Sequence, residues 1–277
     1  MSLHMEIYGD GQPEIYGTSQ PNSQPLLLIH GWGMHGGVWQ PIVEQLAQHF
    51  SLYIVDLPGM GFSTTANSGN LSTVAEQVIA RISTNETGWS VCGWSLGGQV
   101  AMRMALQRPD LIERLVLVGA TPKFVNDDSW QLGMDASVFQ QFADNISQDY
   151  ATTLMKFLTL QCMRASDARN TIKQLRESFT KRPVPSIATL QNALDILLAS
   201  DLRAEVKKLS QTTLIVHGDR DSLAPVAAAH WLAEHLPSAQ LVEIVGASHA
   251  PFLSHPEQFM QALLAFLQPE FTEIKAI

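Results

Sequence analysis

Ser95 is the residue from which the chemistry of this chain is read first. It is the middle residue of GWSLG at 93–97, a G-x-S-x-G pattern. An apolar run from Trp89 stops at Gly93, and apolar residues with helical spacing begin at Leu96, so the serine stands where a strand passes into a helix. The two glycines permit a tight turn that lifts the hydroxyl above the sheet, and the start of the helix favours an oxyanion. The pattern predicts a nucleophilic serine, which needs a base and an acid.

A candidate acid and a candidate base each follow a predicted strand near the end of the chain. Residues 213–217 are an apolar strand followed by Asp219 and Asp221, and residues 240–245 are another, followed by His249. The chain order is then serine, acid, histidine, which is the order expected of an α/β-hydrolase arrangement. We predict Asp221 as the acid, with Asp219 as the alternative.

These groups define a reaction class. Ser95 would attack a carbonyl carbon, His249 would take the hydroxyl proton and return it to the leaving alcohol, and Asp221 would hold the imidazole tautomer. The oxyanion would be bound by the backbone N–H groups of Leu96 and Trp32. The mechanism calls for no metal and no organic cofactor.

Two other histidines near these motifs are predicted to have structural roles. His30 lies beside the loop that carries Trp32, and we interpret it as a support for that loop. His255 precedes Pro256, where a helix is expected to begin.

The elements that must position these residues alternate between strand and helix. Apolar strands are predicted at residues 25–30, 52–56, 89–93, 114–119, 213–217 and 240–245, after an N-terminal hairpin at 5–16. Helices between them indicate a doubly wound, mostly parallel sheet.

The alternation is interrupted once. Residues 123–206 contain no convincing strand and four amphipathic helical stretches, near 135–147, 149–162, 167–180 and 186–199. We predict an all-helical cap at 123–206, inserted between two strands of an α/β core formed by residues 1–122 and 207–277. Such a cap would lie above the strand ends where ligands bind.

The amino-acid composition indicates which partners and which compartment to expect. The 277 residues are 45% hydrophobic but include no apolar run of about 18, so no membrane partner is expected. The N-terminus lacks the pattern of a secretory signal, and two cysteines, Cys92 and Cys162, suit a reducing compartment; we expect a cytoplasmic monomer. A net charge of −9 argues against a nucleic-acid partner.

The charge is unevenly distributed along the chain. Residues 150–182 include seven Lys or Arg and two Asp or Glu, a net charge of +5 within an acidic protein. Three of these bases, Arg169, Lys173 and Arg176, are spaced to share one helix face. The simplest interpretation is a solvated face, and the alternative is a patch that attracts a strongly acidic partner.

Several motifs resemble the α/β-hydrolase superfamily over essentially the whole chain. They are HGWG at 30–33, DLPGMGFS at 56–63, GWSLGG at 93–98, GDRD-x3-P at 218–225 and SHAPFLSHPEQF at 248–259. More narrowly, HGWGM, VDLPGMGFS, GWSLGG, KFLTLQCM at 156–163 and the ending HAPFLSHP resemble the pimeloyl-(acyl-carrier protein) methyl ester esterases of biotin synthesis.

That resemblance implies a serine carboxylesterase that hydrolyses the methyl ester of pimeloyl-acyl carrier protein to pimeloyl-acyl carrier protein and methanol. It also implies that Trp32, Leu96, Ser95 and His249 contact the ester end. The cap would line the acyl channel with Phe157, Leu158, Thr159, Leu160 and Gln161.

The resemblance further implies that basic cap residues hold the acidic carrier protein. Lys156, Arg169 and Lys173 stand at matching positions, while a further expected arginine is replaced by Thr152. Arg164 and Arg176 are the candidates to compensate.

Other functions remain open at this point. The acyl pocket is built by the variable cap, so a broad short-chain carboxylesterase or a carbon–carbon bond hydrolase of the same superfamily is the main alternative. A ligand receptor without turnover is a further one. A dehalogenase is disfavoured because the turn carries a serine rather than an aspartate.

Overall fold

The computed structural model describes residues 3–9, 24–64, 69–82, 88–146, 148–162 and 164–268. In these ranges the strands form a seven-stranded sheet in the order β1-β3-β2-β4-β5-β6-β7. The strands are β1 Met5–Tyr8, β2 Pro25–Ile29, β3 Ser51–Val55, β4 Trp89–Trp94, β5 Ile112–Val118, β6 Thr212–Gly218 and β7 Ala239–Ile244. Only β1 pairs antiparallel, so the predicted mostly parallel sheet is confirmed.

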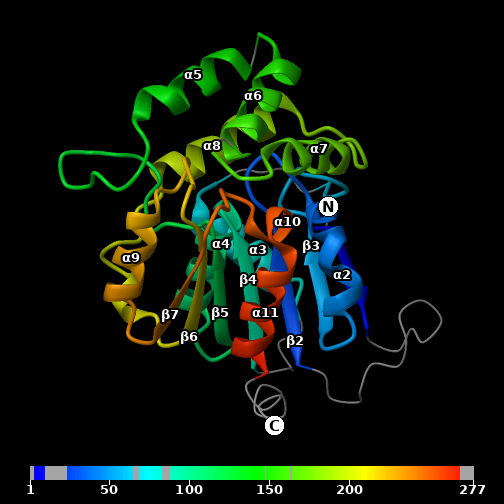
Figure 1. The fold of residues 1–277 in the computed structure, drawn as a ribbon, viewed down its shortest axis with the longest axis vertical. Coiled ribbons are helices and arrows are strands. Elements are labelled where there is room, and N and C mark those ends of the chain that lie inside the picture. Colours follow the sequence, from blue (N-terminus) through cyan, green and yellow to red (C-terminus); the bar gives the residue numbers. More distant parts are fainter. Residues whose placement is uncertain are drawn as a thin grey trace.

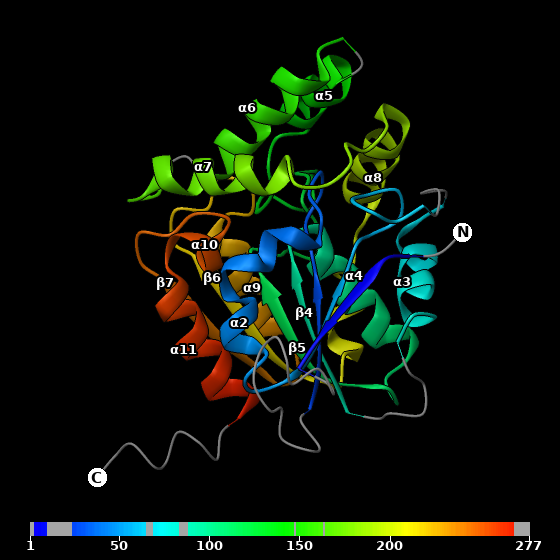
Figure 2. The same ribbon diagram turned by 90° about the vertical axis from the view of Figure 1, so that its right-hand side faces the viewer.

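Helices cover both faces of the sheet. Figure 2 shows α2 and α11 on one face, and α3 and α4 on the other. The helices are η1 Gly36–Trp39, α2 Gln40–Leu46, α3 Leu71–Ile79, α4 Leu96–Gln107, α5 Ala136–Ile146, α6 Tyr150–Cys162, α7 Ala168–Phe179, α8 Ile187–Ala199, η2 Val206–Lys208, α9 Val226–His235, α10 Pro251–Ser254 and α11 Pro256–Leu267. The central strands are therefore buried on both sides, which explains why β2 and β4 are nearly continuous apolar runs.

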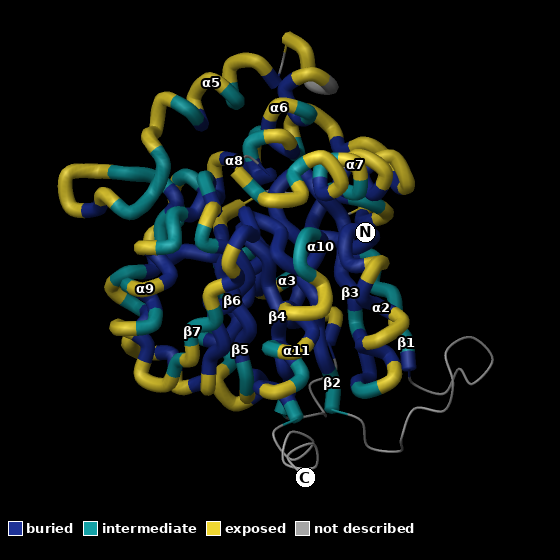
Figure 3. Tube along the Cα trace, in the orientation of Figure 1, coloured by how far each residue is buried: buried dark blue, intermediate teal, exposed yellow. Residues whose placement is uncertain are grey.

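Four helices, α5 to α8, stand between β5 and β6 in the chain. Figures 1 and 2 show them together above one end of the sheet. Their surfaces alternate between buried and exposed residues, whereas the central strands beneath, β2 and β4, are almost entirely buried (Figure 3). The helices agree with the four predicted amphipathic stretches, while the division into domains at residues 123 and 206 stays a prediction.

Two expectations need correction or restriction. Met5–Tyr8 is a strand, as predicted, and pairs with β3 at the edge of the sheet; the second half of the predicted hairpin, residues 10–16, lies outside the described residues. The short helix α10 was not predicted, because four residues between two prolines are too few to show a helical period.

Candidate active site

Ser95 occupies a strained turn between β4 and α4. Its φ is 57° and its ψ is −119°, a backbone conformation that costs a residue with a Cβ about 1–3 kcal/mol. A Cβ on Gly93 would collide with the carbonyl oxygen of Gly97, and one on Gly97 with that of Ile29. Both glycines are therefore required by close backbone packing, as the motif predicted.

Asp221 and His249 are joined by a hydrogen bond between two buried side chains. His249 Nδ1 lies 2.7 Å from Asp221 Oδ2. The other carboxylate oxygen accepts from the backbone N–H groups of Leu223 and Ala224, at 2.8 and 3.0 Å. Burial alone would raise the pKa of Asp221, but attraction to His249 and these hydrogen bonds hold it below its ordinary value. The carboxylate is thus kept ionised and oriented toward the imidazole.

The loop that carries His249 is attached to the serine turn. The indole N–H of Trp94 donates to the carbonyl of His249 at 2.8 Å, and the backbone N–H of His249 donates to Gln161 O at 3.1 Å. His249 Nε2 is buried and has no hydrogen-bond partner among the described residues. That nitrogen is the acceptor a serine hydroxyl would need.

Strand pairing brings the three residues to one edge of the sheet. Ser95 N donates to Val118 O at the end of β5, and a Cβ on the next residue, Gly119, would lie 3.2 Å from His249 Nδ1 and 3.4 Å from Asp221 Oδ2. The bonded pair of Asp221 and His249 therefore lies beside the end of β5, and β5 is the direct neighbour of β4, the strand that precedes Ser95.

The alternative acid has a different task. Asp219 Oδ1 accepts from the N–H of Gly246 at 2.7 Å, which holds together the turns after β6 and β7. His30 supports the loop before Trp32, as expected: its Nε2 accepts from the N–H of Leu57 at 2.9 Å. His255 is the N-cap residue of α11.

The two predicted oxyanion donors flank Ser95. Leu96 is the first residue of α4, and a Cβ on Gly31, next to Trp32, would lie 3.2 Å from Ser95 Cβ. Within the described residues neither the N–H of Trp32 nor that of Leu96 donates to another group. A small apolar cavity between Gly31 and Leu96 extends to Met60 under the cap.

The cap meets the core at Trp32. Its indole N–H donates to the carbonyl of Leu190 in α8 at 3.0 Å, and its ring makes an edge contact with Phe157 of α6, with centroids 4.6 Å apart. Trp32 is fully buried by these contacts. A core loop is thus fixed by two helices of the cap.

The five cap residues expected to line an acyl channel lie on different sides of α6. Phe157, Leu158 and Gln161 are buried, whereas Thr159 is exposed and donates its hydroxyl proton to a backbone carbonyl one turn earlier. Leu160 is half-buried. A helix turns about 100° per residue, so five consecutive residues cannot all face one channel.

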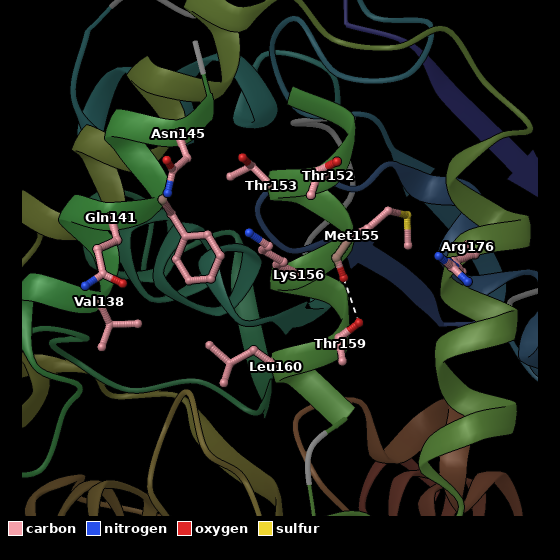
Figure 4. A pocket seen from close by; sticks show the side chains of 11 residues that line it. Val138, Gln141, Asn145, Thr152, Thr153, Met155, Lys156, Thr159, Leu160 and Arg176 are labelled. Carbon is pink, nitrogen blue, oxygen red and sulfur yellow. Dashed lines mark hydrogen bonds between the residues drawn. The ribbon is translucent and has the colours of Figure 1, made fainter. Parts of the chain in front are cut away.

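A cavity of about 700 Å³ lies among α5, α6 and α7. Figure 4 shows its walls, with residues of α5 on one side, residues of α6 between, and Arg176 of α7 opposite. Thr159, Leu160, Lys156 and Arg176 are among its lining residues. The cavity therefore combines apolar side chains with amides, threonines and two basic groups.

The basic residues at 150–182 include both exposed and buried side chains. Arg169, Lys173 and Arg176 are exposed on α7, and Lys156 is exposed on α6. Arg182 is buried instead.

Arg182 forms an ion-paired joint between cap and core. Its guanidinium lies 2.8 Å from Asp56 Oδ2 and 2.8 Å from Glu6 Oε2, joining the segment between α7 and α8 to β3 and β1. Burial alone would raise the pKa of Asp56, but His30, two backbone N–H groups and Arg182 together lower it. Arg182 is one of the seven bases counted at residues 150–182, but its charge is paired inside the protein and adds nothing to the exposed positive surface.

No cluster of three or more His, Cys, Asp or Glu that could hold a metal ion occurs in the described ranges. None of the helices described there is long and apolar enough to cross a membrane.

Comparison with known proteins agrees with this architecture. Residues 24–256 match the family model described as alpha/beta hydrolase fold. A solved esterase from Exiguobacterium antarcticum has a TM-score of 0.82 at 22% identity, covering 96% of this chain and 95% of that one. A bromoperoxidase from Bacillus anthracis has a TM-score of 0.82 at 23% identity over 96% and 95%. At such identities these structures support the fold alone.

Sequence relatives are closer. The pimeloyl-(acyl-carrier protein) methyl ester esterase of Nitrosomonas europaea is 44% identical over 94% of this chain and 97% of its own length. The esterase of the same name from Nitrosospira multiformis is 38% identical over 92% and 99%. The chain belongs to the α/β-hydrolase family and, within it, to the family of pimeloyl-(acyl-carrier protein) methyl ester esterases, which are carboxylic ester hydrolases.

Proposed function

We propose that this protein hydrolyses the methyl ester of pimeloyl-acyl carrier protein, releasing pimeloyl-acyl carrier protein and methanol. The observation that carries the proposal is near full-length similarity to relatives that bear this activity in their names, at 44% and 38% identity. The strained serine and the bonded Asp221–His249 pair supply a chemistry that fits it.

The reaction proceeds through an acyl-enzyme. Ser95 Oγ attacks the ester carbonyl while its proton passes to His249 Nε2, which has no competing partner in the described structure. The N–H groups of Trp32 and Leu96 stabilise the oxyanion. The intermediate collapses, and His249 donates the proton to the departing methoxide, giving methanol.

A water molecule then hydrolyses the acyl-enzyme by the corresponding steps, with water as the nucleophile and Ser95 as the leaving group. His249 takes a proton from a water molecule, the resulting hydroxide attacks the acyl carbon, and the proton returns to Ser95 as the free carboxylate leaves. Asp221 stabilises the imidazolium formed in both halves. The steps need no metal ion or organic cofactor.

The acyl chain is proposed to run between core and cap. Phe157, which packs on Trp32, and the neighbouring buried Leu158 and Gln161 would line it near the ester. Thr159 and Leu160 would contact the substrate further out, because both line the cavity among α5, α6 and α7.

The exposed bases of the cap are proposed to hold the carrier protein. Lys156 and Arg176 line that outer cavity, and Arg169 and Lys173 continue the positive surface along α7. Arg176 stands where it can compensate for Thr152, which lines the same cavity. A cytoplasmic location and a monomeric state remain predictions from the sequence.

Methanol release from the carrier-bound methyl ester tests the proposal. Ser95→Ala should abolish release, while Ser90→Ala should not, since Ser90 is an equally buried serine of the preceding strand. Comparable activity in wild type and Ser95→Ala would refute the serine mechanism. Release from short free esters alone would leave the mechanism and refute the substrate.

A further inference from the structure

A second histidine lies beside the acid of the proposed triad. His217 is the penultimate residue of β6, four residues before Asp221, and it is fully buried. Its neighbour across the sheet is Glu243 of β7, whose carboxylate lies 2.9 Å from His230. The proposed mechanism assigns His217 no task.

The contacts of His217 determine its tautomer. Nε2 lies 2.6 Å from the carbonyl oxygen of Ala224. A carbonyl can only accept, so Nε2 must carry the hydrogen. The same nitrogen is 3.4 Å from Asp221 Oδ2, the oxygen that His249 also contacts.

Ala224 is consequently held from two directions. Its N–H donates to Asp221 Oδ1, and its carbonyl accepts from His217. His217 thereby fixes the turn that provides both backbone donors to the carboxylate. A displacement of this turn would shift Asp221 relative to His249.

The arrangement carries a cost that packing does not explain. With the hydrogen on Nε2, Nδ1 is an acceptor, and it is buried with no partner among the described residues. An unsatisfied buried acceptor destabilises the folded state, whereas an aliphatic side chain would suit this strand position without that loss. Burial also lowers the pKa of His217, which keeps the ring neutral and prevents a second cation from competing with His249 for Asp221.

We propose that His217 is a positioning residue for ester hydrolysis, holding the 221–224 turn so that Asp221 meets His249 in the orientation that supports the imidazolium. This inference rests on the proposed Ser95, His249 and Asp221 mechanism.

Three substitutions separate this role from a purely structural one. His217→Phe keeps the ring volume and removes the donor. His217→Gln can place an amide N–H near the position of Nε2, and His217→Asn, one methylene shorter, cannot. Turnover of p-nitrophenyl butyrate per active site, titrated with a serine-directed fluorophosphonate, corrects for any unfolded fraction.

We expect His217→Phe and His217→Asn to lose about tenfold to a hundredfold in kcat, with KM within about twofold, because misplacement of a catalytic group affects the transition state. The acid limb of the kcat/KM profile should move to lower pH, since the imidazolium loses support. His217→Gln should restore most of both.

Proton NMR provides a readout that does not need turnover. The low-field resonance of the His249 Nδ1 proton should persist in His217→Gln and move upfield in His217→Asn. Equal kcat, pH profile and resonance in all variants would overturn the positioning role, even if their melting temperatures differ. A wild-type enzyme that is inactive on both p-nitrophenyl butyrate and the carrier-bound methyl ester, while its variants show the resonance changes, would instead refute the proposed function and leave the positioning of Asp221 supported.

Discussion

The two halves of the site are built differently. In the core half, Asp221 is held by His249 and two backbone N–H groups, and His249 by two backbone hydrogen bonds. In the cap half, Lys156 and Arg169 are exposed, and the predicted channel residues divide between two sides of α6. In the proposed mechanism the chemistry therefore depends on fixed strand ends, and the proposed choice of substrate depends on a helical surface that can vary independently.

The largest expected effect is in the core half. Asp221→Asn should lower kcat by about 10³–10⁴-fold for carrier-bound and free esters alike, because the wrong imidazole tautomer is favoured. Asp219→Asn is the matched control and should retain most activity, since Asp219 contacts Gly246 rather than His249. Steady-state kinetics on both esters measures this. If Asp219→Asn were the inactive variant, the assignment of the acid would be wrong.

Arg182, which joins the cap to the core, should contribute more to the free energy of unfolding than the exposed bases of the cap. Arg182→Met leaves the buried Asp56 carboxylate without its cation, and we expect a loss of about 3–5 kcal/mol in the free energy of unfolding. Arg176→Met, on the exposed cap surface, should change it by less than about 0.5 kcal/mol. Urea unfolding compares the two. Similar losses would show that the buried and exposed bases do not differ as described.

Acid should lower the stability of the protein through His30, a buried histidine of the core. Burial lowers the pKa of His30 from 6.5 to about 4. The unfolded chain therefore binds this proton near pH 6.5 and the folded chain only near pH 4, so stability is present above pH 6.5 and declines as pH falls through that interval. The loss attributable to His30 should reach about 3 kcal/mol at pH 4.

Urea unfolding at pH 7 and pH 4.5 measures that decline. His30→Gln should reduce the difference between the two pH values, because glutamine does not titrate. An unchanged difference would assign the acid sensitivity to other groups, such as His35 and His217, whose pKa values are also lowered by burial.

The smallest effect is expected from the cap surface. Reversing charge at Arg169 and Lys173 should raise KM for the carrier-bound ester about tenfold at low salt and leave the free ester unchanged, because the interaction is screened and remote from the chemistry. Lys207→Glu, an exposed lysine of η2, is the control. Equal effects on both esters would show that the basic face of α7 is an ordinary solvated surface.

Much of this core half could be predicted from the sequence, because local signals carry it. Ser95 lies in a short motif, and Asp221 and His249 follow apolar strands. The spacing of apolar residues and the order of these three residues along the chain were therefore sufficient to predict them. The joint at Arg182 could not be predicted, since its partners Glu6 and Asp56 are distant in sequence and no local pattern links them.

Other features required the three-dimensional structure for related reasons. The edge pairing of β1 depends on β3, more than 40 residues away. In the sequence, His217 is recognisable only as a residue at the end of a predicted strand. Its importance comes from the 221–224 turn, which it holds through Ala224. A buried histidine directly before an acid-bearing loop was the signal that could have identified it.

The most direct test compares kcat/KM for the methyl ester of pimeloyl-acyl carrier protein with that for p-nitrophenyl butyrate, at low and at moderate salt. We predict a much higher value for the carrier-bound ester, an advantage that shrinks as salt rises while the value for the free ester changes little. Equal values for the two esters, or an advantage insensitive to salt, would contradict an esterase whose basic cap selects a carrier-bound substrate.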